Sequence, residues 1–76
     1  MVNILLNQAL KEVEKLNKGE VFLVKDLFKG YEWNRIPKED RLLLGRLFLN
    51  EMEKEHVTEI QILDKTSSKQ QKYSRV

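Results

Sequence analysis

The stretch VTEIQILDKTSSKQQKY (Val57–Tyr73) decides the fold. In its first half, Ile60 and Ile62 alternate with polar residues, which is the period of a half-buried β-strand. Its middle is polar and contains two adjacent serines, which is typical of a turn. Tyr73 then returns as an apolar side chain on the side of the two isoleucines. These features predict a β-hairpin over about residues 58–75, with a strand at 57–63, a loop at 64–69 and a returning strand at 70–75.

Upstream of the hairpin, the pattern predicts helices and one short strand. Apolar residues recur at spacings of three and four from Leu6 to Leu16, which predicts an amphipathic helix. This helix should stop at residues 17–19, because Gly19 can adopt the left-handed conformation that caps a helix. The elements expected next are a strand at Val21–Val24, a short helix at Lys25–Lys29 that ends at Gly30, a connector at Tyr31–Arg35 and a long helix from Pro37 to about His56.

The long helix has an apolar stripe that predicts its buried face. Proline is well tolerated in the first turn of a helix, so Pro37 marks its start. Gly45 lies inside it, where glycine costs about 1 kcal/mol relative to alanine. We expect this glycine to permit close approach by a neighbouring helix or another backbone. The stripe consists of Leu43, Leu44, Leu47, Phe48 and Met52.

The order of these elements predicts one α+β domain over residues 1–76, of the winged-helix type. In that fold a helix-turn-helix is followed by a β-hairpin, the wing. A lone hairpin is barely stable in water, but the strand at 21–24 can pair with it to form three strands. One face of this sheet, formed by Phe22, Val24, Ile60, Ile62 and Tyr73, can then cover the helices.

Two stretches of the chain resemble a known family. They are Gly19–Phe48 and Asp64–Tyr73, and both are similar to small proteins of Gram-positive bacteria and their mobile elements. The most distinctive parts of the first stretch are the runs Phe22…Lys25-Asp26-Leu27-Phe28 and Trp33…Ile36-Pro37…Arg41…Leu44-Gly45…Phe48. The family is catalogued as a domain of unknown function, and some of its members are labelled single-stranded DNA-binding. The resemblance implies a nucleic-acid ligand and assigns no catalytic residue.

Composition argues against several function classes. The 76 residues contain no cysteine, so disulfides, thiolate metal sites and cysteine nucleophiles are excluded. His56 is the single histidine, and we interpret it as a cation near a helix end. Gly19, Gly30 and Gly45 are isolated and form no phosphate loop. No signal peptide or membrane span is visible. We expect a cytoplasmic, non-enzymatic protein without metal, cofactor or small-molecule substrate.

The positive charge is unevenly distributed. The net charge is +2, but residues 64–76 contain four basic residues against Asp64 alone. Further basic residues lie at the start of the long helix, the half that recognition helices commonly insert into DNA. We therefore predict a small regulatory domain, involved in transcription, that binds nucleic acid, DNA rather than RNA. The predicted contact residues are Arg35, Lys38, Arg41, Arg46, Asn50, Lys65, Ser67, Lys69, Lys72 and Arg75.

A protein interface is the alternative prediction. Leu42 and Leu49 lie seven residues apart on the face of the long helix that is expected to be exposed, which favours a homodimer or a protein partner. Glu39 and Glu53 on that face would repel phosphates. The basic residues also have structural interpretations, because helix cations can pair with glutamates and wing lysines can protect an edge strand. Trp33 is interpreted as core, with base stacking as its alternative.

Overall fold

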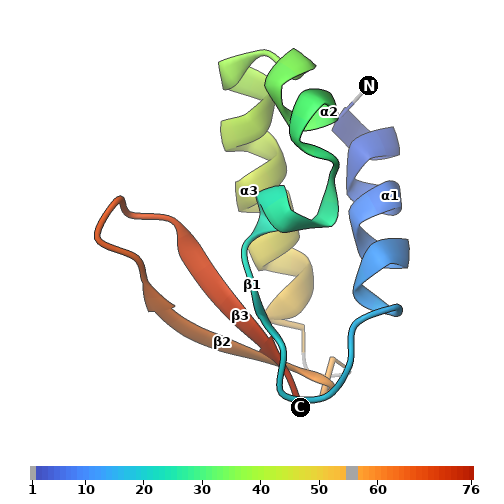
Figure 1. Cartoon of the computed structure of the whole chain (residues 1–76), viewed down its shortest axis with the longest axis vertical. Coiled ribbons are helices and arrows are strands. Elements are labelled where there is room, and N and C mark those ends of the chain that lie inside the picture. The colour runs from blue at the N-terminus through green and yellow to red at the C-terminus, as the bar shows by residue number, and fades with distance from the viewer. Residues whose placement is uncertain (1, 55–56) are drawn as a thin grey trace.

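The computed structural model describes residues 2–54 and 57–76, and it confirms an α+β fold (Figure 1). A three-stranded antiparallel sheet packs against a cluster of helices. In chain order the elements are α1 (Val2–Val13), β1 (Val21–Phe22), the 3-10 helix η1 (Val24–Leu27), α2 (Gly30–Arg35), α3 (Lys38–Met52), β2 (Ile60–Lys65) and β3 (Gln71–Arg75).

Helix α1 ends at Val13, earlier than the predicted stop at residues 17–19. The reason is a tightening of the last turn: the amides of Lys15 and Leu16 donate to carbonyls three residues back, at 3.0 and 3.1 Å. Gly19 adopts the predicted left-handed conformation, with φ +89°. Its amide donates to the carbonyl of Arg75 at 2.6 Å. The glycine therefore turns the chain from α1 onto the end of β3.

The segment between Val21 and Arg35 differs most from the prediction. β1 stops at Phe22, because the Asp26 carboxylate accepts a hydrogen bond from the Leu23 amide (2.9 Å) and starts η1. The predicted connector at Tyr31–Arg35 is wrong, since these residues form most of α2. Gly30 begins this helix instead of ending the previous one. The Glu32 carboxylate accepts from the Lys29 amide at 3.2 Å and so supplies a capping contact at the start of α2.

Helix α3 begins at Lys38, directly after Pro37, and ends at Met52, earlier than predicted. The predicted endpoint, His56, lies outside the described residues. Leu44, Phe48 and Met52 are buried as expected, whereas Leu43 is 41% exposed and does not belong to the core. The expectation of a close approach at Gly45 is also wrong, because a Cβ built there would meet nothing within 4 Å.

The sheet has the strand order β1-β3-β2, so β3 is its central strand. Tyr73 pairs with Phe22 on one side and with Ile62 on the other, which confirms the predicted hairpin and its three-stranded sheet. β2 runs further than predicted, so that Asp64 and Lys65 belong to the strand and not to the loop. Ile62 is 37% exposed and does not belong to the core, although it pairs with the buried Tyr73.

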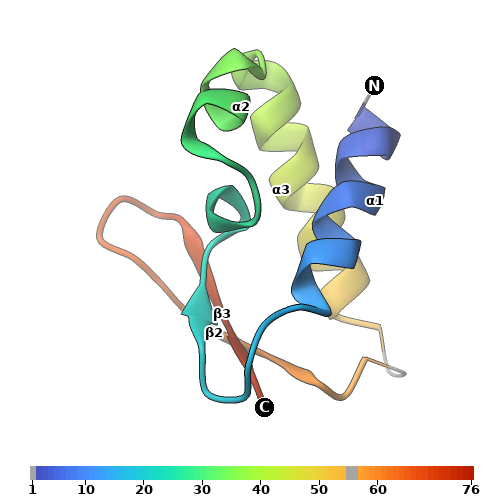
Figure 2. The same cartoon turned by 45° about the vertical axis from the view of Figure 1, so that its right-hand side comes forward.

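Tyr73 connects the sheet to the helices. Its ring is fully buried, stacked on Phe22 at 5.6 Å and edge-on to Phe48 at 5.1 Å between ring centroids. Ala9 and Leu44 complete this core from α1 and α3. Figures 1 and 2 show the hairpin projecting from the helices, with its tip well away from α1. The hairpin is thus anchored at one end and protrudes at the other.

Candidate functional site

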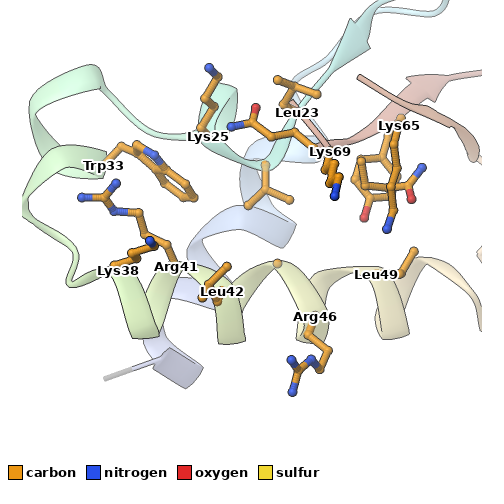
Figure 3. A pocket seen from close by; sticks show the side chains of 15 residues that line it. Leu23, Lys25, Trp33, Lys38, Arg41, Leu42, Arg46, Leu49, Lys65 and Lys69 are labelled. Carbon is orange, nitrogen blue, oxygen red and sulfur yellow. The ribbon is translucent and has the colours of Figure 1, made fainter. Parts of the chain in front are cut away.

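A groove of about 520 Å³ lies between α3 and the hairpin. Figure 3 shows its walls: α3 forms one side, while η1 and the hairpin form the other, with Trp33 of α2 at one end. The lining residues come from five elements, the hairpin loop and the junction between β1 and η1. They are Leu23, Val24, Lys25, Trp33, Lys38, Arg41, Leu42, Gly45, Arg46, Leu49, Lys65, Lys69, Gln70, Gln71 and Tyr73.

The ionic side chains of this lining are all basic. Among residues 2–54 and 57–76, no aspartate or glutamate lines the groove. Cations on both walls of a cleft reinforce one another and raise the local concentration of anions. Figure 3 places Arg46 on the side of α3 that faces away from the hairpin lysines, so it forms an outer rim. The six cations are Lys25, Lys38, Arg41, Arg46, Lys65 and Lys69.

Between the cations the groove is largely apolar. Leu42 is 63% exposed, and Leu49 is half-buried against the core. Gly45 lies between them in the sequence, and the empty space at its missing Cβ leaves the α3 backbone open to the groove. The groove therefore offers apolar contact area as well as positive charge.

A β-bulge determines which charge of β2 faces the groove. Ile62 pairs with Tyr73 and Lys65 pairs with Gln71, so β2 has one residue more than β3 between these pairs. In a regular ladder Asp64 would lie opposite Gln71. The extra residue puts Lys65 there instead, on the face of Gln71 and Tyr73, and Lys65 lines the groove while Asp64 does not.

The hairpin tip is held by local hydrogen bonds. The Gln71 side-chain amide donates to the carbonyl of Leu63 inside the bulge. Thr66 binds Gln70 twice: its amide donates to the Gln70 carbonyl (2.8 Å), and its hydroxyl accepts from the Gln70 amide (3.1 Å). Lys69 closes the turn with φ +67°, the one left-handed non-glycine residue in the described part of the chain. The tip is thus an ordered turn.

Arg41 lines the groove, but its guanidinium already has partners. Its Nε donates to the carbonyl of Ile36 at 2.8 Å, and an Nη donates to the carbonyl of Asn34 at 3.5 Å. The guanidinium also lies 5.8 Å from the ring centroid of Trp33. These contacts tie the start of α3 to the end of α2. Arg41 thereby fixes the junction of α2 and α3, from which Trp33 and Lys38 enter the groove lining.

Five of the ten predicted nucleic-acid contacts lie outside the groove. The Arg35 guanidinium lies 4.9 Å from the Tyr31 ring centroid, away from the groove lining. Arg75 is mostly buried at the other end of β3 and pairs with Glu59 at 3.0 Å. Lys72 alternates with the inward Tyr73 and occupies the opposite face of the sheet. The groove brings together Lys38, Arg41, Arg46, Lys65 and Lys69, and leaves out Arg35, Asn50, Ser67, Lys72 and Arg75.

Sequence reasoning missed several groove residues. Lys25 of η1 was assigned no role, although it completes the basic lining. Gln70 and Gln71 are not among the predicted contact residues, although both line the groove. Trp33, interpreted as core, packs partly on the core and also lines the groove. The alternative interface residues Leu42 and Leu49 lie in this same groove. The acidic capping positions at 26 and 32 were the signal that would have placed η1 and α2.

Tyr73 has an unusual hydroxyl. Burial raises the pKa of Tyr73 to about 12, and the nearby charge of Glu53 adds to this rise. The hydroxyl is buried and has no hydrogen-bond partner among the described residues. The hydroxyl therefore stays protonated at neutral pH, and Tyr73 contributes a neutral side chain to the groove lining.

The described residues bear on two other features, a metal site and a membrane-spanning helix. Within 2–54 and 57–76, His, Cys, Asp and Glu side chains do not gather in groups of three or more that could hold a metal ion. In the same ranges, each helix is too short or too polar to traverse a bilayer.

The fold and the groove define a small α+β domain with a basic, partly apolar cleft. The chain belongs to the family described as domain of unknown function (DUF1413), whose model matches residues 7–75. The match therefore includes most of α1, which lies upstream of the stretch that showed the resemblance. No curated protein and no solved structure matches the chain.

Proposed function

We propose that this protein is a non-enzymatic nucleic-acid-binding domain that holds its ligand in the groove between α3 and the hairpin. The single observation behind this proposal is the groove lining, which has six cations and, among the described residues, no acid. Lysine and arginine neutralise phosphates and release counterions, and this term supplies most of the affinity of non-specific binding. The net charge of +2 alone would not favour such a ligand.

The element order supports a winged-helix type. In this interpretation α2 and α3 are the helix-turn-helix. The β2–β3 hairpin is the wing, and β1 adds the third strand at the edge of β3. The start of α3 and the wing tip lie on the two sides of one groove (Figure 3). This arrangement suits a backbone gripped between helix and wing.

DNA is the ligand that we favour over RNA. A protruding helix and hairpin can reach the wide major groove of B-form DNA, whereas the deep, narrow major groove of A-form RNA excludes them. The domain would act as a small regulator of transcription. Its own lining residues account for binding and orientation, and the mechanism requires no chemical step.

A charge-reversal experiment tests the proposal. Lys38→Glu combined with Lys69→Glu changes both walls of the groove, and Lys11→Glu combined with Lys18→Glu is the matched control at exposed positions outside it. Both variants have the same net charge. With labelled duplex and single-stranded oligonucleotides, the groove variant should lose at least about tenfold in affinity, and its salt slope should fall by about 2. Equal losses in both variants would contradict a specific groove.

A protein partner is the second candidate, because Leu42 is 63% exposed in the groove. A leucine of this exposure at the mouth of a cleft fits a homodimer or a partner helix. Leu42→Asp should then change the mass measured by light scattering while the circular dichroism spectrum stays the same. A monomeric mass in both the parent protein and the variant would remove the homodimer.

A further inference from the structure

We propose that the two backbone irregularities of the hairpin, the bulge at Ile62–Lys65 and the left-handed Lys69, place two lysines against one phosphodiester backbone in the groove. This inference rests on the proposed nucleic-acid function and assigns the hairpin side of its contact. Both irregularities lie in the hairpin, and both change the position of a groove cation. β-bulges and left-handed non-glycine residues recur at functional sites.

The bulge exchanges an acidic for a basic side chain at the groove. Without the extra residue in β2, Asp64 would pair with Gln71 and face α3. With it, Lys65 takes that position and Asp64 stays outside the lining. The Gln71 side chain, itself in the groove lining, holds the bulge through its bond to Leu63. A phosphate that would be repelled by a regular hairpin is therefore attracted by this one.

Lys69 occupies a backbone conformation that favours glycine or asparagine. Its φ of +67° disfavours a lysine relative to either of these residues. A sequence selected only for a stable turn would place glycine there. The lysine side chain instead lines the groove opposite α3 (Figure 3). The side chain thus explains why a less stable residue occupies this turn.

The charges on the two walls of the groove indicate the chemical class of its ligand. Lys65 and Lys69 face the α3 wall, where Lys38 marks the helix start, and acidic side chains are absent from the described lining. A single phosphodiester backbone presents a row of negative charges that complements both walls. It could belong to a single strand or to one strand of a duplex, and the two oligonucleotide types distinguish these sources.

The first test exchanges two neighbours. The double variant Asp64→Lys with Lys65→Asp keeps composition and net charge, and both positions are exposed. Asp would then face the groove, so affinity should fall about tenfold and the salt slope by about 1 or more. Lys72→Asn, which removes a cation from the opposite face of the sheet, should change affinity less than twofold. Unchanged affinity in the exchange variant would overturn the inference.

The second test separates the charge of Lys69 from its backbone. Lys69→Gln, Lys69→Gly and Lys69→Asn should each lower affinity about fivefold, because all three remove the cation. Only the glycine and asparagine variants should also melt higher than the glutamine variant, by about 2–4 °C, because they tolerate the left-handed conformation. Equal melting temperatures in all three, or full affinity in the glutamine variant, would overturn the inference.

The two proposals can fail separately. If the Lys38→Glu, Lys69→Glu variant loses affinity while the exchange and the Lys69→Gln variants do not, the groove binds nucleic acid without the hairpin irregularities, and this inference is wrong. If the unmodified protein binds neither duplex nor single strand at 50 mM salt, a concentration at which a multi-phosphate contact is strong, the nucleic-acid function itself is wrong.

Discussion

The two ends of the hairpin differ in burial: its base is packed in the core, whereas its tip is exposed. At the base, Tyr73 is fully buried and Ile60 is 7% exposed, and β3 pairs with β1 as well as with β2. At the tip, residues 67–70 are exposed, and the turn is held by the Thr66 hydroxyl, which lies 3.0 Å from the Ser68 hydroxyl and accepts a hydrogen bond from the Gln70 amide. The base therefore belongs to the core of the domain, while the tip contributes charge to the groove.

The cations of the hairpin follow the same division. Arg75 at the base pairs with Glu59 at 3.0 Å and is mostly buried, so its charge is used within the fold. Lys65 and Lys69, towards the tip, are exposed and line the groove. Stability and binding should thus depend on different residues of one element, and the following predictions test this separation in order of decreasing effect.

The largest effect is expected from Tyr73→Ala. It removes a fully buried ring that contacts Phe22 and Phe48, so it should lower the free energy of unfolding by about 3–5 kcal/mol, measured by urea denaturation. Ser67→Ala at the exposed tip should change that energy by less than about 0.5 kcal/mol. A comparable loss in both variants would mean that the tip is part of the cooperative core.

The next effect depends on pH. The pKa of Tyr73 is about 12 in the folded protein, above the ordinary value of 10 in the unfolded chain. The folded state binds this proton more tightly, so the contribution is fully present below pH 10 and is lost as the pH rises through 12. The loss approaches about 2–3 kcal/mol. Urea midpoints of the parent protein and Tyr73→Phe, compared between pH 8 and pH 12, measure it.

The phenylalanine variant also provides a control at neutral pH. The Tyr73 hydroxyl is buried and has no partner among the described residues, so its removal should leave the protein equally stable or up to about 1 kcal/mol more stable. A marked destabilisation at pH 7 would show that the hydroxyl makes a hydrogen bond. Parallel pH profiles for both proteins would contradict the raised pKa.

The sequence predicts the base of the hairpin better than its tip. Alternation fixes which side of a strand faces the core, so the pairing of Tyr73 with Ile62 could be read from the apolar residues. The bulge breaks this alternation beyond Ile62, and apolar pattern gives no signal for it among polar residues. For that reason Lys65 and Lys72, which look equivalent in the sequence, lie on different faces of the hairpin.

The helix boundaries predicted between residues 19 and 35 were wrong for a different reason. The capping acids Asp26 and Glu32 start η1 and α2. Gly19 and Gly30 suggested helix ends, but α1 already ends at Val13 and Gly30 begins α2. A helix as short as α2 has little periodicity to detect. The groove could not be predicted at all from the sequence, because it depends on how η1 and α2 pack beside α3.

The third prediction concerns the junction between base and tip. Gln71→Ala removes the side-chain donor to the Leu63 carbonyl in the bulge, so it should cost about 1 kcal/mol of unfolding free energy. Loss of this contact also loosens the register that keeps Lys65 opposite Gln71, and affinity for an oligonucleotide should fall about threefold. Gln61→Ala, a glutamine on the other strand outside the groove, is the control. Full affinity with reduced stability would show that the bulge holds without Gln71.

The smallest effect is expected at the tip itself. Thr66→Val keeps the shape of the side chain but removes the hydroxyl that accepts from the Gln70 amide and lies 3.0 Å from the Ser68 hydroxyl. The backbone bonds that close the turn, from Thr66 to Gln70 and from Lys69 to Thr66, remain. Unfolding free energy should therefore fall by only about 0.5 kcal/mol, whereas oligonucleotide affinity should fall about twofold at an unchanged salt slope, because no charge is removed. A loss of stability above about 2 kcal/mol would contradict the division between base and tip, since it would make the turn as important to the fold as Tyr73.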